Sequence, residues 1–132
     1  MKNIIMALFA VVFTHVAFAH EGHDKTPGAI SAPHGGIIQV AGHLYLELLA
    51  NSEGLKIYPF DHDMKPLPLS ELKFEGTISF PKKTKADPIS FEAQADYFSI
   101  KVDAKGAYRY TLNLKVTYKG KTENAKFNVE PQ

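Results

Sequence analysis

Hydrophobic and polar residues alternate along most of the chain after position 37. The clearest run is 108–118, where the even positions from Tyr108 to Tyr118 are Tyr, Leu or Val. The odd positions between them are Arg, Thr, Asn or Lys. Successive side chains of a β-strand point to opposite faces, so this run predicts a strand with one buried face.

Further runs with the same period predict more strands. Residues 122–129 alternate after Lys119-Gly120, a two-residue turn, which predicts a hairpin at the end of the chain. The runs 44–48, 74–80, 89–93 and 98–102 alternate as well, and 55–60 is a further short strand. About seven or eight strands with no helical pattern predict an all-β domain over 37–132, an antiparallel immunoglobulin-like β-sandwich. A closed barrel is the less favoured alternative. Strand order would distinguish the two architectures, but it is not visible in a sequence.

The first residues have the pattern of a secretory signal. An apolar run from Ile4 to Phe18 follows Lys2 and ends in Ala17-Phe18-Ala19, a small-x-small cleavage pattern. The run is shorter than the roughly 20 apolar residues that a membrane span needs. We therefore expect a signal peptide over 1–19 and a periplasmic or secreted mature protein that begins at His20 and does not span a membrane. Residues 20–36, rich in Gly and Pro, predict a flexible leader.

Charge and cysteine content narrow the partners. Without Lys2, the chain has fourteen Lys and Arg against fourteen Asp and Glu, interleaved along its length. This balance argues against nucleic acid and against anionic lipid as partners. Because the chain has no cysteine, it has no disulfide, and any metal site must use histidine, methionine, carboxylate or the chain terminus.

Five histidines remain after the signal, and all of them lie in the first half of the mature chain: His20, His23, His34, His43 and His62. Cleavage before His20 gives that residue a free amine beside its imidazole, a pair that can chelate Cu(II). His23 is close enough to contribute. A tight amino-terminal copper motif would need histidine where Gly22 stands, so a site built from the leader alone would be loose. The alternative is a solvated tail whose histidines bind nothing.

The other three histidines stand at turns or strand ends. His34 precedes two glycines, whose backbone freedom lets the bend direct His34 to the core edge or to the leader. His43 and Glu47 lie about 13 Å apart along one strand, so only one can join a given site, and His43 is favoured. His62 lies in the turn Asp61-His62-Asp63-Met64, where carboxylate, imidazole and thioether suit copper, nickel or zinc. Ordinary turn chemistry is the alternative at His34 and His62.

Three segments together resemble a known group of proteins: 32–36 (APHGG), 43–49 (HLYLELL) and 58–68 (YPFDHDMKPLP). They resemble a block in small periplasmic proteins and adaptor-linked domains that accompany heavy-metal efflux systems. The resemblance implies that His34, His43 and also Glu47 belong to the functional part. His20 and the fold class give a weaker resemblance to the copper-resistance C proteins, periplasmic β-sandwiches that bind copper through an N-terminal histidine. The chain lacks their methionine-rich stretch, which favours Cu(II) or zinc over Cu(I).

These observations predict a periplasmic metal-binding protein, a carrier or buffer for copper or zinc in metal homeostasis or efflux. The predicted ligands are His20, His23, His34, His43 and His62, and a periplasmic efflux or membrane protein is the expected partner. No catalytic motif is recognisable, so we expect no enzyme. A non-catalytic interaction module with incidental histidines is the alternative, docking through a sheet edge or the face around Tyr45. A copper oxidase built on His20 is a third, less favoured interpretation.

Overall fold

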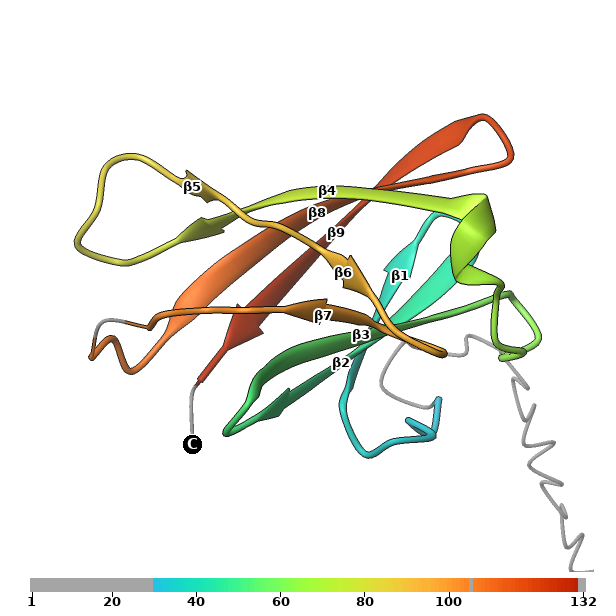
Figure 1. Ribbon diagram of the computed structural model, residues 1–132, viewed down its shortest axis with the longest axis horizontal. Helices are drawn as coiled ribbons and strands as arrows, with labels where there is room; N and C mark the ends of the chain where they lie inside the picture. The colour runs from blue at the N-terminus through green and yellow to red at the C-terminus, as the bar shows by residue number, and fades with distance from the viewer. Residues whose placement is uncertain (1–29, 105, 131–132) are drawn as a thin grey trace, which may run out of the picture.

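The computed structural model describes residues 30–104 and 106–130. This part of the chain forms nine strands and a single turn of 3₁₀ helix, η2, at Leu69–Glu71 (Figure 1). The strands are β1 (Ile37–Ala41), β2 (Leu44–Asn51), β3 (Gly54–Phe60), β4 (Leu72–Ser79), β5 (Asp87–Pro88), β6 (Glu92–Ala93), β7 (Phe98–Ile100), β8 (Tyr110–Tyr118) and β9 (Lys121–Val129).

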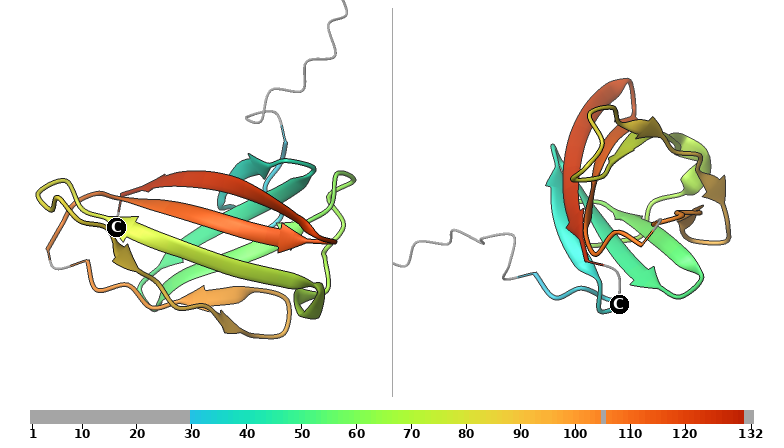
Figure 2. Two further views of the ribbon diagram at one scale, coloured as in Figure 1. Left: turned by 90° about the horizontal axis from the view of Figure 1, so that it is seen from above. Right: turned by 90° about the vertical axis from the view of Figure 1, so that its left-hand side faces the viewer.

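The strands form two antiparallel sheets in the order β1-β2-β3-β7-β6 and β5-β4-β8-β9. Within them, β2-β3-β7-β6 corresponds to the ABED sheet of an immunoglobulin domain, and β4-β8-β9 corresponds to its CFG sheet. The predicted antiparallel β-sandwich is thus confirmed, with nine strands where the pattern indicated about seven or eight. The two sheets pack face to face, and β1 lies beside β9 where their edges meet (Figure 2).

The core lies between the sheets and follows the alternation of the sequence. Leu46, Leu48 and Ile57 enter it from one sheet, and Leu112 and Phe127 enter it from the other. The β8–β9 hairpin turns at Lys119 and Gly120, as predicted, and both residues have positive φ, 49° and 76°. Two positive φ values identify a type I′ turn, which matches the twist of the flanking strands.

Three predicted strands are longer in the sequence pattern than in the structure. Tyr108 precedes β8 and is 72% exposed, whereas the pattern placed it on the buried face. The runs 89–93 and 98–102 contain only β6 and β7, of two and three residues. The run 89–93 is short because the chain crosses there from the sheet of β5 to the sheet of β6, after the Ile89 N–H has donated to the Gly76 carbonyl of β4 at 3.1 Å. In residues 30–104 and 106–130, no helix has the length and apolar character of a membrane span.

Candidate functional site

Glu47 is a charged side chain enclosed by protein, the single one among the described residues. It lies in the middle of β2, on the face opposite Leu46 and Leu48, which the alternation assigns to solvent. Its exposed fraction is nevertheless 0%. A buried carboxylate is stable only when hydrogen-bond donors surround it, so the segment that covers Glu47 must supply them.

Among the described residues, His34 and Gly36 supply these donors. The backbone N–H groups of His34 and Gly36 donate to Glu47 Oε1, at 2.8 and 2.9 Å. The imidazole Nδ1 of His34 lies 2.9 Å from the other oxygen, Oε2. The last residues of the predicted leader are therefore bound to the outer face of β2.

The two glycines after His34 allow this arrangement. A side chain at Gly36 would overlap the backbone carbonyl oxygen of Leu48, so only glycine permits the segment to approach β2 this closely. Gly35 has a φ of 77°, and its N–H donates to the Ala32 carbonyl at 3.1 Å, closing a turn. The His-Gly-Gly sequence thus supplies the hydrogen bonds to the Glu47 carboxylate and positions His34.

The His34 ring is also held from one side by aromatic residues. It stacks on Tyr58, with 3.7 Å between ring centroids and 15° between planes, and Phe60 lies 6.2 Å away. Tyr58 is the cross-strand partner of Glu47 and in turn packs against Tyr97. Burial raises the pKa of the Tyr58 phenol above its usual value of 10.0, against the lowering effect of Lys56. The His34 side chain is still 35% exposed.

This geometry leaves one nitrogen of His34 available for chemistry. An ionised carboxylate only accepts hydrogen bonds, so Nδ1 carries the proton in the pair with Glu47. In the neutral imidazole, Nε2 then has a free lone pair. Histidines that bind metal ions usually donate their other ring nitrogen to a carboxylate or carbonyl in this way. We call His34, Gly36, Glu47 and Tyr58 the His34 site.

His43 and His62 lie elsewhere and both line a cavity of about 350 Å³ that we call the end cavity. It lies where the β1–β2 turn, the turn after β3 and the β8–β9 hairpin come together. Its lining residues are His43, Leu44, Asp61, His62, Tyr118, Lys119, Lys121 and Glu123. His34 is not among them.

The turn after β3 presents His62 to this cavity. Asp61 Oδ1 accepts hydrogen bonds from the backbone N–H groups of Asp63 and Lys65, each at 2.9 Å. The Lys65 N–H, helped by that of Asp63, holds the pKa of Asp61 below its usual value. His62 itself is 75% exposed, and its Nε2 lies 3.2 Å from Asp63 Oδ2. Asp61 thus performs the turn role that aspartate commonly has.

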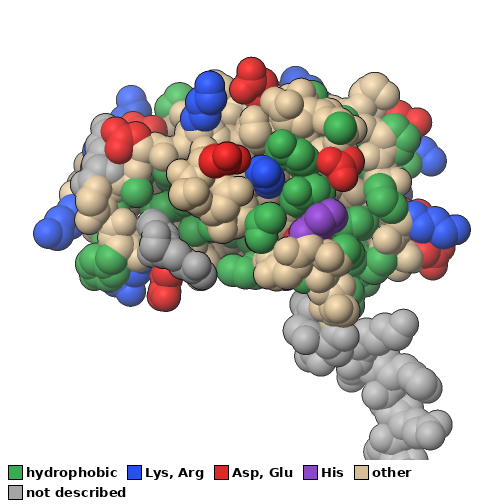
Figure 3. All heavy atoms as spheres, turned by 60° about the horizontal axis from the view of Figure 1, so that its bottom comes forward, with side chains coloured by type: hydrophobic (Ala, Val, Ile, Leu, Met, Phe, Trp, Pro, Cys, Tyr) green, Lys and Arg blue, Asp and Glu red, His purple; other side chains and the backbone are tan. Residues whose placement is uncertain are grey.

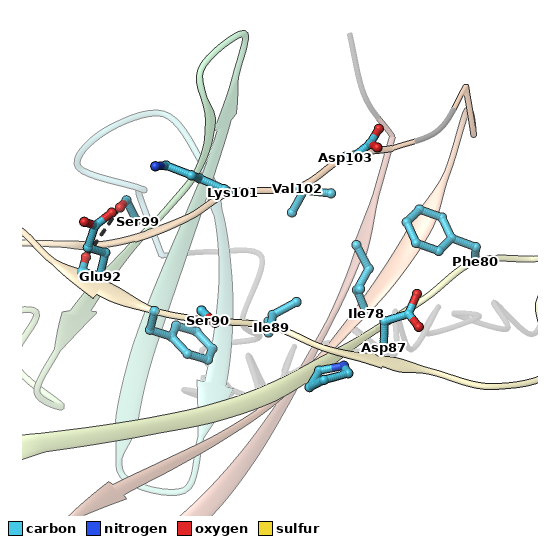
Figure 4. A pocket seen from close by; sticks show the side chains of 12 residues that line it. Ile78, Phe80, Asp87, Ile89, Ser90, Glu92, Ser99, Lys101, Val102 and Asp103 are labelled. Atoms are coloured by element: carbon cyan, nitrogen blue, oxygen red, sulfur yellow. Dashed lines mark hydrogen bonds between the residues drawn. The ribbon is translucent and has the colours of Figure 1, made fainter.

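A second cavity, of about 500 Å³, lies on the open flank of the sandwich (Figure 4). Ile78, Ile89 and Val102 line it with apolar side chains, while Asp87 and Asp103 lie at one end. It contains no histidine. Figure 3 shows another face, on which one histidine lies among hydrophobic side chains and no large patch of a single charge appears.

The structure therefore separates the predicted ligands. His34 pairs with Glu47, whereas the sequence argument favoured His43 over Glu47; His43 and His62 share the end cavity. His20 and His23 lie outside the described residues. Within residues 30–104 and 106–130, no group of three or more histidine and carboxylate side chains is assembled for a metal ion. No local signal in the sequence identifies Glu47 as buried, because a charge between two inward leucines is the ordinary pattern of a strand with one face in solvent.

Comparisons with known proteins add no relative. No protein-family model matches the chain, and neither the curated proteins nor the solved structures contain a significant match.

Proposed function

We propose that this protein is a periplasmic metal-binding protein, a non-catalytic carrier or buffer for copper or zinc. One observation carries the proposal: His34 Nδ1 is hydrogen-bonded to the buried Glu47 carboxylate at 2.9 Å. The lone pair of Nε2, on the other side of the ring, is then the one that can bind a metal ion. Stacking on Tyr58 fixes the plane of the ring. An imidazole held in one orientation loses less entropy on binding a metal than a freely rotating one.

The donor set fits copper and zinc. Both ions bind neutral imidazole nitrogen, and neither needs thiolate, which the chain lacks. One imidazole does not complete a site, so further donors are required. The sequence supplies two imidazoles ahead of His34, at His20 and His23, and an amine at His20 if the signal is cleaved there. These residues are the proposed co-ligands. A periplasmic efflux or membrane protein is the proposed partner that exchanges the ion.

The test is a titration of the protein that begins at His20 with Cu(II) and Zn(II), by calorimetry and copper EPR, with a competing chelator. We expect a one-to-one site with a nitrogen-rich EPR signal, weakened at least tenfold in H34A. H62A is the matched control, because it removes an exposed histidine that lies outside the His34 site. An affinity unchanged in H34A would exclude His34 as a ligand.

A second function, an interaction module, is favoured by one feature of β1. This strand ends its sheet beside β9, and the side chains of Ile37 and Val40 on it are 51% and 39% exposed. Exposed apolar side chains of this kind are suited to contact with another protein. If this is the function, crosslinking to a periplasmic partner persists after chelation of metal and is lost in I37K/V40K. Loss of crosslinking on chelation would instead favour the metal carrier.

A further inference from the structure

The cavity of about 500 Å³ on the open flank, which we call the flank cavity, is lined mainly by residues 87–92 and 99–103 (Figure 4). Ile78, Ile89 and Val102 direct apolar side chains into it from three separate segments. Sites for small molecules in proteins have volumes of about 300–1,000 Å³ and mostly apolar walls. The flank cavity is therefore large enough to hold a small molecule with an apolar body.

The two ends of the flank cavity differ in charge. The carboxylates of Asp87 and Asp103 lie at one end, whereas the other end has Glu92 beside Lys101, two opposite charges (Figure 4). A positive charge on a ligand is therefore attracted to the end with the two aspartates. The lining as a whole suits a hydrocarbon that carries a cation at one end.

A lysine of the chain itself shows which cation this end accepts. Lys83 lies in the turn between β4 and β5, where its N–H donates to the Phe80 carbonyl at 3.0 Å. Its ammonium Nζ lies 2.9 Å from Asp87 Oδ2 and 5.8 Å from the centroid of the Phe80 ring. Asp87 and Phe80 both line the flank cavity. A carboxylate and an aromatic face together are a recognised environment for an ammonium group.

We propose that the flank cavity binds a small apolar primary amine. The hydrocarbon part lies between Ile78, Ile89 and Val102, and the ammonium takes the place of Lys83 at Asp87. The Lys83–Asp87 pair is exposed, and exposed pairs of this kind contribute little to stability, so the exchange costs little. Lys83 is thus a competitor held beside the cavity by its own turn, and it weakens the binding of the amine.

The test is a titration of the full mature chain with hexylamine at neutral pH, followed by NMR of ¹³C-labelled isoleucine and valine methyl groups. We expect the signals of Ile78, Ile89 and Val102 to shift with one midpoint. Ile37 and Val40 are exposed but do not line the flank cavity, so their signals stay in place. Hexanol, which has the same hydrocarbon and no charge, binds several-fold more weakly. Equal affinities for the two probes, or shifts spread over all exposed methyl groups, would overturn the proposal.

Charge variants of exposed residues test the place of the ammonium. D87N removes the carboxylate and weakens hexylamine binding several-fold. K83Q removes the competitor and strengthens binding several-fold. K82Q is the matched control, because Lys82 is an exposed lysine of the same turn that does not line the flank cavity, and we expect it to leave the affinity unchanged. A K83Q variant that binds hexylamine no better than K82Q would show that the ammonium does not replace Lys83.

A lysine side chain of a partner protein carries the same ammonium, so a second probe separates the two sources. The blocked peptide acetyl-Val-Lys-Val-amide brings backbone polar groups that the apolar wall of the cavity does not satisfy, and we expect it to bind more weakly than hexylamine. Tighter binding of the peptide would overturn the assignment to a small amine. The flank cavity contains no histidine, so D87N leaves the metal titration unchanged, and failure of either proposal is seen separately.

Discussion

At the scale of single residues, the buried Glu47 carboxylate holds the segment before β1 against β2. A carboxylate removed from water is costly unless donors compensate it, and here one short segment supplies three of them. His34, Gly36 and Glu47 therefore behave as one unit. A change at any of them leaves a polar group of the others without its partner.

The first prediction concerns that unit. Glu47→Leu leaves the N–H groups of His34 and Gly36 without an acceptor beneath the segment, so we expect the free energy of unfolding to fall by about 3 kcal/mol. Glu47→Gln retains an acceptor oxygen and loses less, about 1 kcal/mol. Urea denaturation measures both. A Leu variant as stable as wild type would mean that the segment leaves β2 freely.

The second prediction tests the close approach at Gly36. Gly36→Ala places a methyl group against the Leu48 carbonyl. We therefore expect the free energy of unfolding to fall by about 1–3 kcal/mol and metal binding to weaken. Gly106→Ala is the control, because no atom lies within 4 Å of a side chain there. Its only cost is its φ of 73°, about 1 kcal/mol, with metal binding unchanged. Calorimetric titration separates the two effects.

The third prediction concerns the pH dependence of Tyr58. Its pKa is raised in the folded protein, chiefly by burial, so folding favours the protonated phenol. The stability that this pKa shift contributes is complete at pH values below the unfolded pKa of 10.0. It is lost as the pH rises through the higher pKa of the folded protein. Tyrosinate absorbance against pH follows the ionisation, and urea denaturation at each pH follows the stability. Tyr58→Phe should flatten that decline; an unchanged decline would assign it to other groups.

At the scale of elements, the β8–β9 hairpin is the part that the sequence predicts best. Its alternation is regular, and Lys119-Gly120 provides a two-residue turn. Lys119 nonetheless has a φ of 49°, which lysine adopts at some cost.

The fourth prediction follows from that φ. Lys119→Asn relieves the strain, because asparagine tolerates positive φ. We expect the free energy of unfolding, measured by thermal denaturation, to rise by about 0.5–1 kcal/mol. Lys126→Asn is the control, since Lys126 is exposed in the middle of β9, where asparagine is less suited than lysine to a strand. A gain in the control but not at Lys119 would contradict the turn argument.

Other elements are less accessible from the sequence. Alternation predicts β2, but it places Glu47 on the polar face, because the cover comes from residues 11 and 13 positions earlier. The shortness of β5 and β6 depends on the crossing between sheets, which no local pattern reveals. The shared cavity of His43 and His62 likewise depends on three turns meeting at one end of the sandwich. Hydrophobic alternation predicts individual strands, whereas a site depends on which strands and turns lie next to each other in the folded protein.

At the scale of the whole molecule, the sandwich relies on its core. The chain has no cysteine, so no disulfide links the sheets. Packing between the two inner faces must provide the stability that crosslinks provide in many exported domains. Phe127 of β9 is the largest fully buried side chain among the described residues.

The fifth prediction measures that reliance. Phe127→Ala removes a buried ring and leaves a cavity, so we expect a loss of about 3–5 kcal/mol, a large share of the stability of a small domain. Phe127→Leu retains most of the volume and loses much less. Denaturation followed by circular dichroism compares them. Equal losses in the two variants would indicate that the core does not close around this residue.

The donors of Glu47 also determine where the independently folding unit begins. The hydrophobic pattern starts at Ile37, and excision of the domain at that residue would look harmless. It would strip the carboxylate of its partners and open the outer face of β2 to water. A fragment that starts at Ile37 is therefore expected to be less soluble and more easily cleaved by proteases than one that retains His34. Fusions, truncations and transplanted versions of this sandwich need the short segment before the first strand as much as the strands themselves.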